Sequence, residues 1–287
     1  MTAVIRVRNH PVRLIKATTL AIALATGIIP AVTYAEDAPD FLNDSFHLAL
    51  GTYIVNTDTE IQLDGDAATG TPINWENTFG GGDVTRFRVD GQWRFADRHK
   101  ARFMVFNTSR SQSRTLSEDI DFNGETYPVN ARVSADFSFD IYELAYEYSF
   151  MKREDYEIAG SFGVHYTTLS AGLKAKASTS NGTLTGDLNE EGSVDLPLPV
   201  IGLRGTWGLP HNFWIDAGAQ FFALSIDEYD GNLQDYRLML TWQPRKWLGL
   251  GLGYNVFRVD VDVDKQNFKG SLDWQYDGPM ISYNAMF

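Results

Sequence analysis

The stretch Thr85–Phe95, TRFRVDGQWRF in one-letter code, decides the fold. Its apolar side chains, Phe87, Val89, Trp93 and Phe95, fall on alternate positions, and mostly charged or polar residues stand between them. An alternation with a period of two predicts a β-strand with one apolar and one polar face. In a soluble sandwich the polar face meets water, whereas in a membrane barrel the apolar face meets lipid and the polar face lines the lumen.

The rest of the chain repeats this pattern in segments that are long for strands, and no sustained helical period competes with it. We expect strands over residues 45–62, 83–95, 101–115, 134–150, 156–175, 194–209, 212–229, 233–243, 247–263 and 272–287. Many of them match or exceed the roughly 9 to 11 residues that a tilted transmembrane strand needs. The predicted fold class is all-β, a single closed antiparallel transmembrane β-barrel of about ten strands, with about eight as the alternative.

The connectors between these segments alternate in length. Short connectors fall at 96–100, 151–155, 210–211 and 243–246, and long ones near 64–82, 117–133 and 176–193. Short turns at one end and long loops at the other are typical of outer-membrane barrels, whose turns face the periplasm. A soluble sandwich gives no reason for such sorting, so the connectors favour the barrel.

Composition excludes several classes of protein. The chain has 287 residues, a formal net charge of -13 and no Cys. Without Cys, disulfide frameworks, Cys-ligated metal sites and thiol nucleophiles are excluded. An acidic chain is a poor partner for nucleic acid, so we expect no such partner. A mean hydropathy of -0.24 is too low for a bundle of transmembrane helices.

Residues 1–35 are interpreted as a secretory signal peptide. Four cations precede an apolar stretch over residues 17–32: Arg6, Arg8, Arg13 and Lys16. A transmembrane anchor is the alternative, but about 16 apolar residues interrupted by Gly and Pro fall short of the roughly 20 that a spanning helix needs. We therefore expect a cleaved leader and a barrel domain over residues 36–287 in the cell outer membrane.

The final segment ends on an aromatic residue in the same alternating pattern, with Ile281, Tyr283 and Phe287 on one face. Together with the leader and the strand pattern, this ending resembles Gram-negative outer-membrane β-barrel proteins over the whole mature chain. The connector plan is similar to small monomeric barrels of the outer-membrane protein A and W type, although those commonly have eight strands. The resemblance implies that Ile281, Tyr283 and Phe287 form the signal read by the barrel assembly machinery. It also implies a monomer in contact with outer-membrane lipid and lipopolysaccharide.

Projecting the strands onto a barrel predicts a charged lumen. The inward-facing set holds seven cations and five anions: Arg86, Arg88, Asp90, Arg94, Arg102, Arg110, Glu143, Glu147, Arg204, Asp216, Asp235 and Arg237. Either these charges pair across the lumen and plug it, or they line a narrow polar path. Buried charge without a partner costs several kcal/mol, so we expect pairing. The predicted function is structural or surface interaction, with a narrow porin-like channel for small solutes as the alternative.

The sequence gives little support for a catalytic or cofactor site. His165 and Thr167 share a face, which weakly resembles the His-x-Ser pair of outer-membrane lipid A deacylases, but a lumenal His165 would not meet lipid. His47 projects inward, and His99 and His211 lie in short connectors. The expected outer loops therefore lack the His that proteases of the omptin type need beside Asp. We predict no enzymatic activity, no catalytic residue and no cofactor, with a lipid- or peptide-modifying enzyme as the remaining alternative.

Acidic residues gather near the outer ends of the expected strands. Asp260, Asp262 and Asp264 alternate along one segment, and Asp273 follows in the next. Carboxylate oxygens are the ligands that Ca²⁺ and Mg²⁺ prefer, although no EF-hand pattern is present. The simpler interpretation is a solvated acidic rim that meets the divalent cations bridging lipopolysaccharide phosphates. No defined metal site is predicted.

Overall fold

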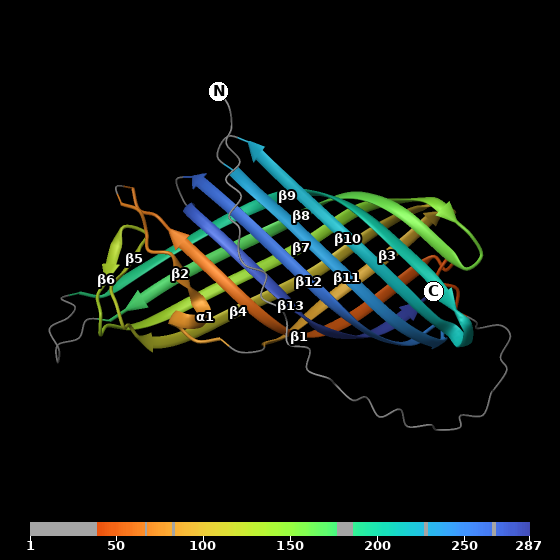
Figure 1. The fold of residues 1–287 in the computed structure, drawn as a ribbon, viewed down its shortest axis with the longest axis horizontal. Coiled ribbons are helices and arrows are strands. Elements are labelled where there is room, and N and C mark those ends of the chain that lie inside the picture. Colours follow the sequence, from red (N-terminus) through yellow and green to blue (C-terminus); the bar gives the residue numbers. More distant parts are fainter. Residues whose placement is uncertain (1–38, 67, 82–83, 177–185, 227–228, 266–267) are drawn as a thin grey trace, which may run out of the picture. The chain divides into compact units, whose positions relative to one another are not determined.

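A computed structural model of the protein describes residues 39–287 except 67, 82–83, 177–185, 227–228 and 266–267, so the predicted signal peptide lies outside the described residues. Ten long strands form the wall (Figure 1), and each overlaps one expected segment. They are β1 (Phe46–Leu63), β3 (Val84–Ala96), β4 (His99–Thr115), β7 (Arg132–Lys152), β8 (Tyr156–Ala175), β9 (Leu188–Leu209), β10 (Phe213–Ile226), β11 (Tyr229–Arg245), β12 (Leu248–Lys265) and β13 (Phe268–Met286).

These strands form one antiparallel sheet that closes on itself. Each long strand neighbours the next one in the chain, and β13 returns to pair with β1 from His47↔Met286 to Leu63↔Gly270. The prediction of a closed ten-stranded barrel is confirmed, and the eight-stranded alternative is wrong. Among the described residues, no helix has the length and apolar character required to cross a bilayer.

The two ends of the barrel differ in their connectors. Four short turns lie at one end, the turn end, and one of them is the 3-10 helix η1 (Pro210–Asn212). The opposite end, the loop end, carries β2 (Ile73–Asn74), α1 (Trp75–Thr78) and a hairpin of β5 (Ile120–Phe122) and β6 (Glu125–Tyr127). Figure 1 places the C-terminus at the turn end and this hairpin at the other. Asn123 and Gly124 form the hairpin turn with φ of 52° and 86°, the left-handed conformations that an Asn-Gly turn supplies.

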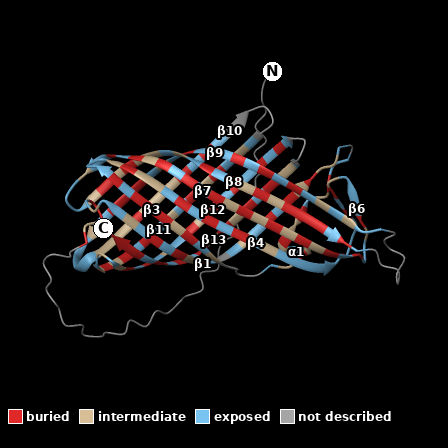
Figure 2. Ribbon diagram, turned by 180° about the vertical axis from the view of Figure 1, so that it is seen from behind, coloured by how far each residue is buried: buried red, intermediate tan, exposed pale blue. Residues whose placement is uncertain are grey.

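The wall next to the turns, which we call the turn half, is apolar outside. In β7 it comprises residues 142–152. Phe87, Leu144, Phe162 and Ile201 point outward and are 74%, 67%, 63% and 66% exposed, respectively. Buried and exposed positions alternate along these strands (Figure 2). This belt has the character of a lipid-facing surface, and the predicted outward orientation of Phe87 is confirmed in this half.

The wall toward the loops, which we call the loop half, reverses this chemistry without changing the alternation. In β7 it comprises residues 132–141, where Phe137 and Phe139 point inward and Ser138 and Asp140 point outward. This strand has 21 residues, about twice the length that spans a bilayer. Its first part therefore extends beyond the hydrocarbon, where polar side chains face water and apolar ones form a core, as in a soluble barrel. Most of the expected charged lumen thus lies in the turn half.

Strand pairing in the loop half is incomplete. The β9–β10 ladder ends at Ile201↔Phe221, and the β1–β3 ladder likewise stops short of the loop end. Beyond these points the ladders divide the described wall into two parts of the same sheet, β4–β7–β8–β9 and β10–β11–β12–β13–β1, which we call the two sheets of the loop half, and both contribute to the apolar core. Pro197 and Pro199 lie in the part of β9 that has no β10 partner. Proline has no N–H to donate, so it suits a strand edge.

Candidate functional site: the filled lumen

Six cations and six carboxylates fill the lumen of the turn half, and their side chains are 11% exposed or less. We call this set the lumen network: Arg88, Asp90 and Arg94 on β3, Lys100 and Arg102 on β4, Glu143 and Glu147 on β7, Glu157 on β8, Arg204 on β9, Asp216 on β10, and Asp235 and Arg237 on β11. Period-two alternation places all of them on the inner face. Six positive and six negative charges leave no net formal charge, which is the arrangement that buried ions require.

One chain of ion pairs crosses the middle of the lumen. Arg88 donates from Nε and Nη2 to the two oxygens of Asp90, both at 2.8 Å. Arg237 connects two carboxylates, with 2.9 Å to Asp90 and 3.5 Å to Asp216. Asp216 in turn accepts from Arg204 Nε at 2.5 Å. Strands on opposite sides of the barrel are thereby linked by charge-assisted hydrogen bonds, the strong kind.

A second group of pairs lies closer to the turns. Arg94 donates to both oxygens of Glu157, at 3.0 and 2.7 Å. Lys100 Nζ lies 2.5 Å from Glu147 and 3.1 Å from Glu157. Arg102 reaches the other oxygen of Glu147 at 3.4 Å. Two carboxylates are thus shared by three cations.

Two carboxylates of the network remain: Asp235, which lies beside Arg88 and Asn255, and Glu143, which is held by a glutamine and a histidine. Gln220 donates to it at 2.6 Å, and His165 Nε2 lies 3.4 Å from its other oxygen. His165 is fully buried in the lumen, away from the outer belt. This position fits a structural histidine better than one that acts on lipid.

The structure brings ten of the twelve predicted lumen residues into the network and leaves out Arg86 and Arg110, which lie nearer the loop end. Two members escaped the sequence analysis. Lys100 falls in an expected connector, and Glu157 is the second residue of an expected strand. The alternation could have identified Lys100, because it lies two residues before Arg102 and therefore on the same face of the strand.

Arg110 belongs to the loop half, where it holds α1 in place. Its Nη1 lies 2.5 Å from Glu76, and its Nη2 donates to Thr59 at 2.7 Å. The guanidinium carbon lies 5.5 Å from the ring centre of Trp75 and 4.9 Å from that of Phe137. A cation between two aromatic faces gains cation–π attraction on both sides. Arg110 therefore fastens α1 over the core.

Aromatic rings fill the lumen below α1, and we call this group the aromatic core. Its ring centres lie 4.2 Å apart for Phe139 and Trp274, 5.1 Å for Phe257 and Tyr276, and 5.5 Å for Phe106 and Tyr276. The pair Phe139 and Trp274 joins the two sheets of the loop half, since it links β7 to β13. Rings at these distances are in packing contact.

The β5–β6 hairpin covers the aromatic core from the loop end. Ile120, Phe122 and Tyr127 are buried. The Tyr127 hydroxyl donates to the carbonyl of Leu173 at 2.7 Å. Burial raises the pKa of Tyr127 to about 12, so the hydroxyl stays a donor at neutral pH.

At the turn end, the segment Pro39–Ser45 folds across the mouth of the barrel, and we call it the cap segment. The ring of Phe41 is buried, 4.5 Å from the ring of His47 and 5.2 Å from that of Trp214. Lys246 Nζ lies 2.7 Å from Asp44 and ties the segment to a turn. The cap segment therefore closes the lumen on this side.

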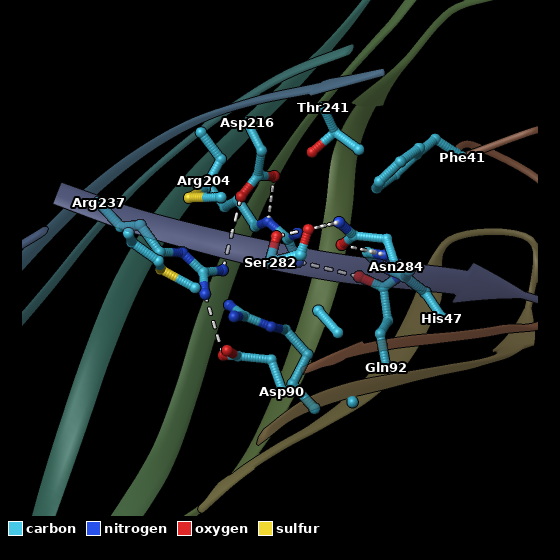
Figure 3. Close-up of a pocket in the computed structure, with 15 residues that line it drawn as sticks. Phe41, His47, Asp90, Gln92, Arg204, Asp216, Arg237, Thr241, Ser282 and Asn284 are labelled. Carbon is cyan, nitrogen blue, oxygen red and sulfur yellow. Dashed lines mark hydrogen bonds and ion pairs between the residues drawn. The ribbon is translucent and has the colours of Figure 1, made fainter. Parts of the chain in front are cut away.

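A cavity of about 40 Å³ with a mixed polar and apolar lining separates the cap segment from the lumen network. Figure 3 shows Arg204, Arg237, Asp90 and Asp216 on one side of this cavity, with Phe41 and the polar side chains near it on the other. A space of this size is large enough for a few water molecules. Among the residues that the structure describes, no group of three or more His, Asp or Glu is arranged to hold a metal ion.

The predicted C-terminal signal lies on the outer face of β13 and just beyond its end. Ile281, Tyr283 and Phe287 are 56%, 40% and 65% exposed. The amide of Phe287 donates to the carbonyl of Phe46 at 2.9 Å, so the end of the chain is paired with the first strand.

The predicted acidic rim lies on the outer face of the loop half. Asp260 on β12 is the cross-strand partner of Asp273 on β13, and Asp262 and Asp264 continue the same face. These carboxylates point away from the lumen and do not belong to the network.

Comparison with known proteins supports the fold of the chain. No protein-family model and no curated protein matches the chain. The outer membrane protease OmpT from Escherichia coli has a TM-score of 0.55 at 10% identity, covering 87% of this chain and 99% of OmpT. The toluene transporter TodX from P. putida (0.37, 10% identity, 87% and 91% covered) and Ail, the attachment invasion locus protein of Yersinia pestis (0.34, 9%, 84% and 99%), are less similar. The chain has the fold of Gram-negative outer-membrane β-barrels, and the predicted likeness to the A and W type stays a prediction.

Proposed function

We propose that this protein is an outer-membrane barrel with a sealed lumen, which serves a structural role or acts through its outer surface. The supporting observation is that side chains occupy the lumen at three successive levels: the cap segment, the lumen network and the aromatic core. An ion entering from either side meets a paired charge network or an apolar core, and both oppose passage.

Single-channel recording in planar bilayers tests this proposal. Protein whose folded state is verified by heat modifiability in a detergent gel should give no conductance steps above the lipid baseline, and its insertion is checked by flotation with liposomes. Defined, reproducible steps would instead support the alternative, a narrow porin-like channel for small solutes, for which the cavity above the cap segment would be one segment of the path.

We also propose that the outer rim of the barrel has no catalytic site. The described histidines lie far from the loop end of the wall: His99 and His211 are at the turn end, His47 is beside the cap segment and His165 is in the lumen network. Mass analysis of lipid A and a peptide-cleavage assay on cells with and without the gene test this part. We expect identical profiles, and a lipid or peptide product that depends on the gene would contradict it.

For partners, we propose that the acidic rim meets lipopolysaccharide through divalent cations. Asp58 and Glu60 on β1 extend the acidic face of β12 and β13, since Glu60 is the cross-strand partner of Asp273. Millimolar Ca²⁺ should raise the melting temperature in micelles that contain lipopolysaccharide and leave it unchanged in plain detergent. A shift in plain detergent that Asp262→Asn abolishes would point to a discrete metal site instead.

We also propose that Phe287, with Tyr283 and Ile281, directs assembly of a monomeric barrel after removal of residues 1–35. Phe287→Ala should lower the amount of heat-modifiable protein in the outer membrane of cells while refolding in detergent is retained. Phe46→Ala is the matched control, because Phe46 is also an exposed aromatic residue at the turn end. Equal loss for both variants would mean that the rim aromatics stabilise the barrel without directing its assembly.

A further inference from the structure

The cavity above the cap segment has a local excess of positive charge, although the lumen network as a whole is neutral. Three guanidinium groups line it, those of Arg102, Arg204 and Arg237, and only two carboxylates do, those of Asp90 and Asp216. The formal charge around the cavity is therefore +1. A buried space that is lined by more cations than carboxylates favours an anion.

Arg102 is the source of this excess. The shortest ion pairs of the other five network cations measure 2.5 to 2.9 Å, whereas the ion pair of Arg102 with Glu147 measures 3.4 Å. The same carboxylate lies 2.5 Å from Lys100, so its charge is already shared. Arg102 is thus the least neutralised cation of the network, and it lines the cavity.

The size and the walls of the cavity select the kind of anion. A volume of about 40 Å³ holds only a few water-sized particles, which admits a halide ion and excludes an organic phosphate. Ser282 and Asn284 add hydroxyl and amide groups to the lining, and Phe41 covers the side toward the turns. An anion there would meet these donors and the guanidinium groups on one side and the Phe41 ring on the other.

We propose that this cavity is a binding site for a single small monatomic anion of the chloride class, held by Arg102 together with Arg204 and Arg237, with Phe41 as its cover. The anion would offset the local positive excess of the residues that line the cavity. This proposal goes beyond the sealed-lumen function. The two can be tested separately, because a sealed lumen can bind an anion without conducting it, and a conducting lumen need not contain a saturable anion site.

Line broadening of ³⁵Cl⁻ in nuclear magnetic resonance tests the site on the whole folded barrel in detergent. We expect saturable broadening that bromide displaces and sulfate does not. Arg102→Gln should abolish the saturable part, and Arg110→Gln is the matched control, because that arginine belongs to the loop half and pairs with Glu76. Equal broadening for Arg102→Gln and the unmodified protein, or displacement by sulfate, would overturn the proposal.

Two further variants keep the test decisive if Arg102→Gln folds poorly. Ala49→Leu adds an apolar side chain at the cavity lining without changing charge, and it should remove the saturable broadening from a barrel that remains heat-modifiable. Phe41→Ala should keep binding and accelerate exchange between bound and free anion. Saturable broadening that survives Ala49→Leu would place the ion elsewhere and contradict the assignment.

Discussion

The turn half and the loop half are made from the same strands and the same alternation, yet they place charge on opposite sides of the wall. In the turn half the outer face is apolar and Arg88, Glu147 and their partners are enclosed. In the loop half the outer face carries Asp140 and Asp260, and Phe139 and Trp274 are enclosed. The surroundings of each half, lipid or water, determine which face is polar. The interior then takes the opposite character and must be filled in its own way, by ion pairs or by rings.

The largest expected effect comes from removing one charge of the lumen network. Glu147→Ala leaves Lys100 and Arg102 without their shared carboxylate in a buried space, which should lower the free energy of unfolding by about 3–5 kcal/mol. Denaturant unfolding in micelles measures it. Glu60→Ala, an exposed carboxylate of the loop half, should change the free energy by less than about 0.5 kcal/mol. Equal effects would mean that the two halves do not differ as described.

A charge placed on the outer face of β7 distinguishes the halves directly. Leu144→Arg puts a cation on the lipid-facing belt and should cost about 2–4 kcal/mol when the barrel is folded in lipid. Ser138→Arg, six residues along the same face, should be nearly neutral because that position faces water. Refolding into liposomes at increasing urea compares them, and a large penalty at both positions would extend the lipid belt into the loop half.

A smaller effect is expected where α1 meets the loop-half core. Glu76→Gln weakens the contact with Arg110 and the hydrogen bonds from Thr59, and should destabilise by about 1.5–3 kcal/mol. The change should also speed proteolysis near α1. Glu191→Gln, on the exposed face of β9, is the control that should leave both measurements unchanged.

The smallest effect concerns the β5–β6 hairpin and depends on pH. Tyr127→Phe removes one hydrogen bond to Leu173 and should cost about 1 kcal/mol at pH 8. The folded pKa of about 12 lies above the ordinary value of 10.0, so the contribution of Tyr127 is complete below pH 10 and is lost as pH rises through 12. The difference in unfolding free energy between the two proteins should therefore shrink between pH 10 and 12. A difference that stays constant over this range would contradict the raised pKa.

The strands of the wall could be predicted from the sequence, because period-two alternation assigns each residue to one of the two faces of a strand. In a closed sheet these two faces are the inside and the outside of the barrel. The alternation predicted Arg88, Asp90 and Arg237 as lumen residues for that reason. It did not predict height along the barrel, so Arg110 was grouped with charges that lie nearer the turns. The reversal in the loop half keeps the period but shifts its phase. The apolar residues of β7 change from odd positions, such as Phe139 and Ile141, to even positions, such as Tyr142 and Leu144, and a projection with one phase along each strand misses this change. The cap segment has no periodic signal, because its position depends on Phe41 meeting the rings of His47 and Trp214.

The seam between β1 and β13 also constrains the order of events during biogenesis. Its partners, such as His47 and Met286, stand at opposite ends of the folded chain, so no partially synthesised polypeptide can complete the cylinder. Until the last residues arrive, both boundary strands offer bare hydrogen-bonding groups, which invites aggregation. Contacts between residues so remote in sequence also form slowly. The period before β13 pairs with β1 is therefore the stage at which this topology is most exposed to aggregation.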